Sequence, residues 1–288
     1  MKFLDLLGNL FGKKEAAQNV ENTTEEVFTE ADLMRCLALS KMKTVKIEAI
    51  PHENLPLTAS KFLGTPYFPK TMEYPKDSQN QPMILLAQLN FAETPPLENY
   101  PIEGILQFFI SANHDYFGSD MDSYDYFGKL TNKNEDVNYK IIYHSVIIEN
   151  LSQVETPIFN FEETNLPIDT EHEIKFTLED EYAPISDWRH RSYFSKAEYD
   201  ILYNDDDLLD KYCNSITSLG HKIGGYANFT QEDPRSDEWG SDYILLFQMD
   251  SIGDHIMWGD VGVANFFITE KDLKNKDFSH VFYTWDCC

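Results

Sequence analysis

The hexapeptide Ile84-Leu-Leu-Ala-Gln-Leu89 recurs 160 residues later as Ile244-Leu-Leu-Phe-Gln-Met249. Two further blocks repeat in the same order. Leu63-Gly-Thr-Pro-Tyr-Phe68 is echoed from Ile223-Gly-Gly onward, and Gly104-Ile-Leu-Gln-Phe-Phe-Ile110 by Gly262-Val-Ala-Asn-Phe-Phe-Ile268, 158 residues later. Three blocks in one order at a nearly fixed offset predict an internal duplication.

Each half therefore carries an apolar run interrupted by one glutamine, followed by a second apolar run. Residues 84–86 and 266–268 lack polar alternation, so we expect strands that are covered on both faces. Further strands are predicted at residues 44–50 (ended by Pro51), 139–148, 173–178 and 279–285.

Capping patterns predict the helices. Thr29 with Asp32 opens one that runs to about Met42, and Ser195 with Glu198 opens a second. Residues 206–219 continue helically until Gly220, a suitable C-terminal cap. We therefore predict an α+β fold, internally duplicated and pseudo-symmetric, of mainly antiparallel sheets with a few peripheral helices.

The expected organisation is a flexible amphipathic leader at residues 1–28 and a single duplicated domain at residues 29–288. Repeat one spans about 50–150 and repeat two about 215–288, with a two-domain split near 150–170 as the alternative. The leader places Leu4, Leu7 and Phe11 at helical spacing. It is interpreted as a frayed or back-docked helix, or as a docking peptide for a membrane surface or partner groove.

The charge balance restricts the partners. The chain has 288 residues with 23 basic and 49 acidic side chains, so its net charge is 23 − 49 = −26 with histidine neutral. Because phosphate affinity depends on lysine and arginine, we expect no nucleic-acid binding. No stable membrane insertion is expected either, because a membrane helix needs ~20 consecutive apolar residues. The charge suits a basic protein partner; the sequence does not fix the oligomeric state.

Four cysteines in 288 residues do not form a disulfide framework, and the chain lacks a run of ~20 apolar residues. Cys36 and Cys213 are predicted to be core residues. Cys287 and Cys288 are adjacent and so a poor pair for one bridge. A cytoplasmic location is expected.

Several of these blocks also carry a family resemblance. Leu63-Gly-Thr-Pro-Tyr-Phe-Pro69, the glutamine-bearing strands and Trp258-Gly-Asp-Val-Gly262 resemble the YwqG-like family of bacterial proteins, over roughly residues 50 to 287. The resemblance implies a duplicated α+β fold and a bacterial cytoplasmic setting. It implies no catalytic residues, because that family is largely of unknown function. Some members are encoded near polymorphic-toxin genes, which implies an immunity or accessory role.

Five residues are candidates for ligand binding. Trp258 and Asp260, with His255 just upstream, offer an aromatic face and a carboxylate, or a core anchor and a turn-locking side chain. Gln88 and Gln248 could cradle a ligand between the halves or cross-link the core. His221 lies beside a glycine turn that lacks the phosphate-loop pattern.

The sequence contains none of the catalytic or metal-binding motifs that we considered. The histidines form no H-x-x-x-H or H-E-x-x-H pair, and no C-x-x-C or G-x-S-x-G occurs. The acidic run with Asp120, Asp122 and Asp125 lacks the spacing of a calcium loop. We therefore expect no cofactor and no metal site, and a non-enzymatic protein acting through protein–protein contacts, as an immunity or accessory protein to a basic toxin. The alternative is a small-molecule binding module with its pocket between the repeats; an enzyme of unrecognised type ranks third.

Overall fold

The computed structural model describes residues 28–119, 138–148, 150, 154–155, 164–236 and 240–288. Ten strands form one sheet, and two short strands form another. The strands of the large sheet are β1 (Met42–Pro51), β2 (Lys61–Phe62), β4 (Ile84–Asn90), β5 (Ile105–Ile110), β6 (Tyr139–His144), β8 (His172–Glu181), β9 (His221–Gly224), β10 (Tyr243–Asp250), β11 (Val263–Thr269) and β12 (Phe282–Asp286). The small sheet pairs β3 (Phe68–Pro69) with β7 (Val154–Glu155).

The order of strands in the large sheet is β12-β11-β10-β9-β1-β8-β2-β4-β5-β6. The two long strands β1 and β8 pair antiparallel at its centre, from Met42 opposite Glu181 to Pro51 opposite His172. Outward from β1 stand β9 to β12, and outward from β8 stand β2, β4, β5 and β6, so the order on one side mirrors that on the other. Every pairing in the sheet is antiparallel, which confirms the predicted sheet type.

The glutamine-bearing strands also share an irregularity. The register between β4 and β5 shifts between Leu85 and Ala87, and that between β10 and β11 shifts between Leu245 and Phe247. In each strand one extra leucine, Leu86 or Leu246, is inserted as a β-bulge, which increases the local twist.

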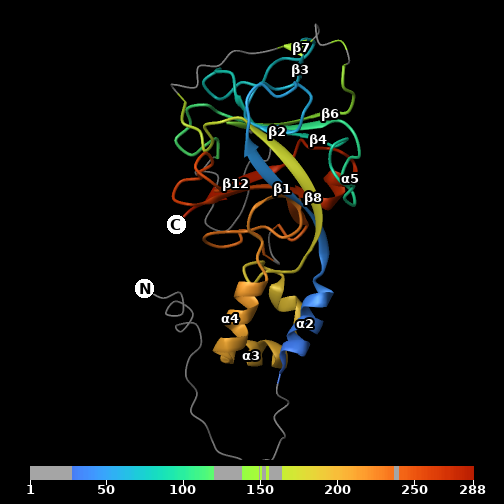
Figure 1. The fold of residues 1–288 in the computed structure, drawn as a ribbon, viewed down its shortest axis with the longest axis vertical. Helices are drawn as coiled ribbons and strands as arrows, with labels where there is room; N and C mark the ends of the chain where they lie inside the picture. The colour runs from blue at the N-terminus through green and yellow to red at the C-terminus, as the bar shows by residue number, and fades with distance from the viewer. Residues whose placement is uncertain (1–27, 120–137, 149, 151–153, 156–163, 237–239) are drawn as a thin grey trace, which may run out of the picture.

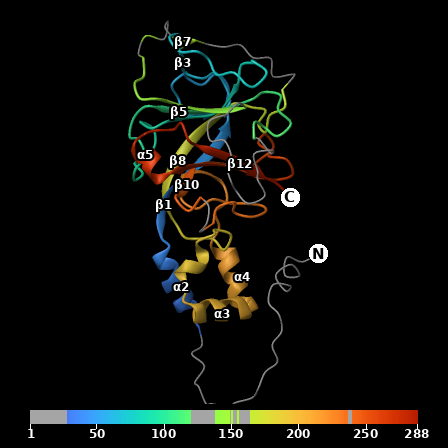
Figure 2. The ribbon, with the colours of Figure 1, turned by 180° about the vertical axis from the view of Figure 1, so that it is seen from behind.

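The two arms of the sheet fold over and pack face to face, as Figures 1 and 2 show. Phe108 of β5 contacts both Phe247 of β10 and Phe266 of β11, with ring centroids 4.8 Å apart in each pair. Phe62 of β2 lies 5.8 Å from the Phe247 ring. All four rings are fully buried, which explains why residues 84–86 and 266–268 have no polar face.

Three helices gather at one end of the molecule, away from the small sheet (Figure 1). They are α2 (Glu30–Leu39), α3 (Lys196–Asn204) and α4 (Asp206–Ser215); the 3₁₀ helix η4 (His190–Tyr193) precedes α3, and α5 (Glu270–Lys274) follows β11. Thr29 and Ser195 form the predicted capping boxes at the starts of α2 and α3. With one large antiparallel sheet and a few peripheral helices, the fold fits the predicted α+β class in broad terms.

Several boundary predictions were wrong. The first helix was expected to run to about Met42, but α2 ends at Leu39 and Met42 begins β1. The strand expected at 139–148 ends at His144, and the one expected at 279–285 begins at Phe282.

We expected a helix to Leu219, but α4 ends at Ser215, because Ile216 already has an extended backbone (φ −118°, ψ 104°). The carbonyls of Ser218 and Gly220 beyond it are bound by the Gln248 amide. We also expected Pro51 to lie just after the strand, but it is the last residue of β1. Proline lacks a backbone N–H, and at the end of a strand this costs little sheet hydrogen bonding.

All four cysteines are free thiols. Cys36 is buried, as expected. The prediction for Cys213 was wrong: it lies on the exposed side of α4, whose buried side is provided by Leu208 and Tyr212. The leader, except Phe28, and Asp120, Asp122 and Asp125 lie outside the described residues.

Candidate functional site

Gln88 lies on β4 and is fully buried. Its Nε2 donates to the carbonyls of Leu57 and Ala59 at 2.8 and 2.7 Å, and its Oε1 accepts the backbone N–H of Tyr67 at 2.9 Å. The Gln107 amide donates a further bond to the same oxygen at 2.7 Å. The hydrogen-bond capacity of this amide is therefore used within the protein.

Gln248 occupies the matching position of β10 and is also fully buried. Its Nε2 donates to the carbonyls of Ser218 and Gly220 at 2.9 and 2.8 Å, and its Oε1 accepts the backbone N–H of Asn228 at 2.7 Å. Each glutamine thus ties two loop segments to its strand, and both donor hydrogens of each amide are occupied.

His221 starts β9 and is almost completely buried. Its Nδ1 accepts the backbone N–H of Asp250 at 3.0 Å, and its ring lies edge-on to Phe62, with centroids 5.2 Å apart. Burial lowers the pKa of His221 to about 3, so the ring is neutral at physiological pH with its proton on Nε2. The described residues give Nε2 no hydrogen-bond partner.

Trp258 is fully buried and anchors the loop of residues 251–262. Its ring packs against Phe117, Tyr283 and Trp285 at centroid distances of 5.6, 6.4 and 6.2 Å. Ser251 Oγ accepts the Trp258 N–H at 2.8 Å, which closes the loop on itself.

Asp260 follows in the same loop, but its side chain is exposed. Between Trp258 and Asp260 stands Gly259, with φ of +56°, where an added Cβ would lie 2.8 Å from the Cys287 sulfur. Glycine is required there for both the backbone angle and the close approach.

The five predicted residues are all among those described, and no hydrogen bond joins any two of them. Gln248 pairs across the sheet with Lys222, the chain neighbour of His221. Trp258 and Asp260 belong to the loop beyond β10.

The loop of residues 251–262 presents apolar side chains to solvent. Ile252, Met257 and Val261 are 48%, 47% and 57% exposed. Val261 also has a φ of +56°, a strained angle for a β-branched residue. Strain of this kind concentrates at functional sites, so this loop is the centre of the candidate site.

The same loop packs against the segment that leads into β8. Ile256 forms an isolated bridge with Ile168, the Met257 N–H donates to the Pro167 carbonyl at 2.7 Å, and the Asp169 N–H donates to the His255 carbonyl at 3.2 Å. The two segments are therefore held side by side.

This contact assembles a polar group that the sequence revealed only in part. His255 Nδ1 lies 2.8 Å from Asp169 Oδ1 and 3.2 Å from Thr170 Oγ1, and the His172 ring stands 6.1 Å from the His255 ring. His255 was recognised beside the tryptophan. The others were missed, since Asp169 and Thr170 lie 86 and 85 residues from it and form no spacing motif.

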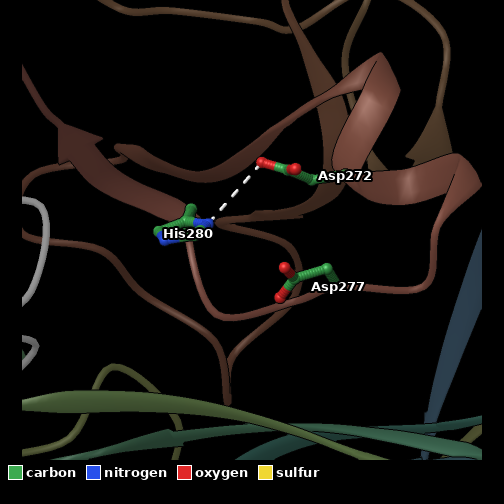
Figure 3. A group of neighbouring side chains, drawn as sticks. All are labelled: Asp272, Asp277 and His280. Atoms are coloured by element: carbon green, nitrogen blue, oxygen red, sulfur yellow. Dashed lines mark ion pairs between the residues drawn. The ribbon is translucent and has the colours of Figure 1, made fainter.

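A second group of potential metal ligands lies near α5. Asp272, Asp277 and His280 each offer one ligand atom, all within 4.8 Å of one another. Figure 3 shows His280 turned toward Asp272, and its Nδ1 lies 3.7 Å from the carboxylate. Two carboxylates and an imidazole could bind a divalent cation. However, Asp277 Oδ1 already accepts the N–H and hydroxyl of Ser279, as in an ordinary turn.

Two lysines are fully buried in the sheet. Lys222 Nζ lies 2.7 Å from Glu181 Oε1, which also accepts from Lys46 at 2.9 Å. Lys61 Nζ donates to the carbonyls of Leu55 and Thr65. Burial lowers the pKa of both lysines. Their contacts serve to bind loops and strands together.

The geometry defines a mostly antiparallel β protein with few helices and a polar group between the loop after β10 and the start of β8. Over residues 60–287 the sequence matches a family described as a domain of unknown function, DUF1963, and the chain belongs to that family. No curated protein matches the chain. The helices among the described residues are too short or too polar to span a bilayer.

Proposed function

We propose that the protein is a non-enzymatic binding module whose acidic surface engages a basic protein, in the manner of an immunity or accessory protein to a basic toxin. The observation that carries this proposal is the charge of the helical end. Exposed carboxylates gather on α3 and α4: Asp200, Asp205, Asp206, Asp207 and Asp210. Only Lys196 and Lys211 balance them within these helices.

The place of these helices in the chain supports the same reading. Between β8 and β9 the chain inserts residues 182–220, which include α3 and α4, whereas the matching connection between β1 and β2 has only residues 52–60. The paired arms of the sheet share their strand order, their bulges and their glutamine bonds. We infer that an internal duplication produced the arms and that the helical insertion was added to one of them.

The packing between the two arms of the sheet favours a binding site on the surface rather than a pocket between the arms. Phe62, Phe108, Phe247 and Phe266 fill the space where the arms meet, and both glutamine amides are bonded to backbone groups. A ligand between Gln88 and Gln248 would have to displace these contacts.

The setting we propose is the bacterial cytoplasm, and the relationship we propose is with the YwqG-like proteins. Four free thiols and the absence of a disulfide among them suit a reducing compartment. The repeated Gly-aromatic and glutamine blocks are the basis of the proposed relationship.

The partner can be identified by native mass spectrometry of the protein purified gently from its own host. A co-purified basic protein supports the proposal, whereas a retained small molecule favours the alternative of a ligand-binding module. The association rate with the identified partner is then measured at low and high salt.

Charge variants locate the contact. The triple variant Asp206→Asn, Asp207→Asn and Asp210→Asn is compared with the control Glu53→Gln, Glu98→Gln and Glu103→Gln, which removes the same charge from exposed positions outside the helices. We expect the helical variant to slow association about tenfold or more at low salt and the control to change it much less, because rim charges act mainly on the association rate. Equal effects would contradict a contact at the helical end.

A further inference from the structure

The rings of His172 and His255 lie close together, edge to face, although the two residues come from distant parts of the chain. His172 is the first residue of β8, and His255 lies in the loop of residues 251–262. Their ring centroids are 6.1 Å apart and the ring planes are inclined by 66°. The bridge between Ile168 and Ile256 holds the two segments together.

The hydrogen bonds fix the tautomer of each ring. His172 Nδ1 lies 2.6 Å from the Thr170 carbonyl, and His255 Nδ1 lies 2.8 Å from Asp169 Oδ1. A carbonyl and a carboxylate only accept hydrogen bonds, so both Nδ1 atoms carry the proton. The unprotonated nitrogen of each neutral ring is therefore Nε2.

Both rings are anchored through Nδ1 on the same dipeptide, Asp169-Thr170, so both Nε2 atoms are turned away from it. The hydrogen bonds of the described residues use neither Nε2 atom. A histidine that binds a metal almost always donates its other N–H to a carboxylate or backbone carbonyl, and both histidines do so here.

The local charge and exposure favour a cation. The Asp169 side chain is 69% exposed and the His255 side chain 42%, so solvent reaches the pair, while His172 is 97% buried and held in place. Asp254, the exposed chain neighbour of His255, adds a further negative charge to the same loop.

We propose that His172 and His255 bind a divalent transition-metal ion through their Nε2 atoms, with water completing the coordination. With a Zn–N bond of about 2.0–2.1 Å, two imidazoles on one ion stand roughly 5–6 Å apart between ring centres, close to the observed separation. Imidazole suits Zn²⁺, Ni²⁺ and Cu²⁺, whereas Mg²⁺ prefers oxygen ligands.

The test is a titration of the full-length chain with Zn²⁺ alone, followed by calorimetry and by NMR of the imidazole nitrogens. We expect the Nε2 signals of His172 and His255 to shift together at one equivalent of Zn²⁺. We expect His255→Gln to weaken binding at that site at least tenfold, and Asp169→Ala to weaken it about tenfold, because the carboxylate orients the ring.

His280→Gln is the matched control, since the His280 side chain is 43% exposed against 42% for His255. Its Zn²⁺ binding at His172 and His255 should equal that of the parent. His255→Gln removes an exposed side chain and so avoids the folding defect that a change at buried His172 could cause. Zn²⁺ that shifts other groups and leaves both histidines unchanged, or affinity that falls with His280→Gln and not with His255→Gln, would overturn the proposal.

Discussion

Gln88 and Gln248 make equivalent hydrogen bonds in the two arms of the sheet. The Nε2 of each donates to two loop carbonyls, at residues 57 and 59 in one arm and 218 and 220 in the other. The Oε1 of each accepts a backbone N–H, from Tyr67 or Asn228. One side chain in each arm thus fixes the path of two loops around a strand without polar alternation.

Replacing Gln248 by methionine, which is of similar length, should reduce the free energy of unfolding by about 3 kcal/mol or more. The change leaves one buried N–H and two carbonyls without their partner, and each unsatisfied group costs about 1–3 kcal/mol. Urea denaturation measures the loss, with exposed Gln79→Met as the control. A loss no larger than that of the control would contradict a structural role for the amide.

The two glutamine-bearing strands could be predicted from the sequence, because a short apolar run without polar alternation is typical of a strand that is buried on both faces. Capping also located the starts of α2 and α3 correctly, since Thr29 and Ser195 act within one turn. The end of α4 was mispredicted because Ile216 turns to an extended backbone, and the segment after it is bound through the carbonyls of Ser218 and Gly220 by Gln248, 30 positions from Ser218. The group around His255 was missed for the same reason: Asp169 and Thr170 reach it only through the fold.

Acid should destabilise the protein partly through His144. This ring is 5% exposed and its Nε2 lies 2.7 Å from Gln107 Oε1, and burial lowers its pKa to about 4. Between pH 6.5 and about 4, His144 is protonated in the unfolded chain but stays neutral in the folded protein. The stabilisation is therefore complete above pH 6.5 and is lost as the pH falls toward 4.

The loss from this single group is about 3 kcal/mol, at 1.36 kcal/mol for each pKa unit. Urea denaturation at several pH values between 7 and 4 checks it against His144→Gln, which cannot take up the proton. The variant will be less stable at neutral pH, but its unfolding free energy should fall less steeply with acid. Parallel pH profiles would show that His144 does not contribute.

Arg235 should stabilise the contact between the helical insertion (residues 182–220) and the arm of the sheet formed by β9 to β12. Its guanidinium is 1% exposed, bonds Asp233 at 2.8 Å and Asp187 at 3.4 Å, and lies 4.6 Å from the Phe267 ring centre. Arg235→Met leaves two buried carboxylates with less compensation. The expected loss is about 3–5 kcal/mol, as when one partner of a buried ion pair is removed.

Arg191→Met is the control for this change, because Arg191 is exposed and stacks only on Tyr199. Adding Asp233→Asn to Arg235→Met should restore part of the stability, since the amide needs no counter-charge. Thermal unfolding of the three variants measures both effects. A double variant less stable than Arg235→Met alone would show that charge burial is not the cause.

Val261 should be a site where a single exposed substitution stabilises the protein. Its φ of +56° is costly for a β-branched residue, by about 1–2 kcal/mol, whereas asparagine adopts this region more readily. Val261→Asn should therefore raise the free energy of unfolding by about 1 kcal/mol. Val146→Asn is the matched control: Val146 is 76% exposed, against 57% for Val261, and is not among the residues with positive φ.

The two valine variants separate backbone strain from the general effect of placing a polar residue on the surface. Urea denaturation should show a gain for Val261→Asn and no gain for Val146→Asn. If the strain also shapes the loop that carries His255, the relaxed variant should bind Zn²⁺ less well while being more stable, since strained conformations persist where function needs them. A gain in stability at both positions would attribute the effect to polarity, and no gain at either would show that the loop holds Val261 without strain.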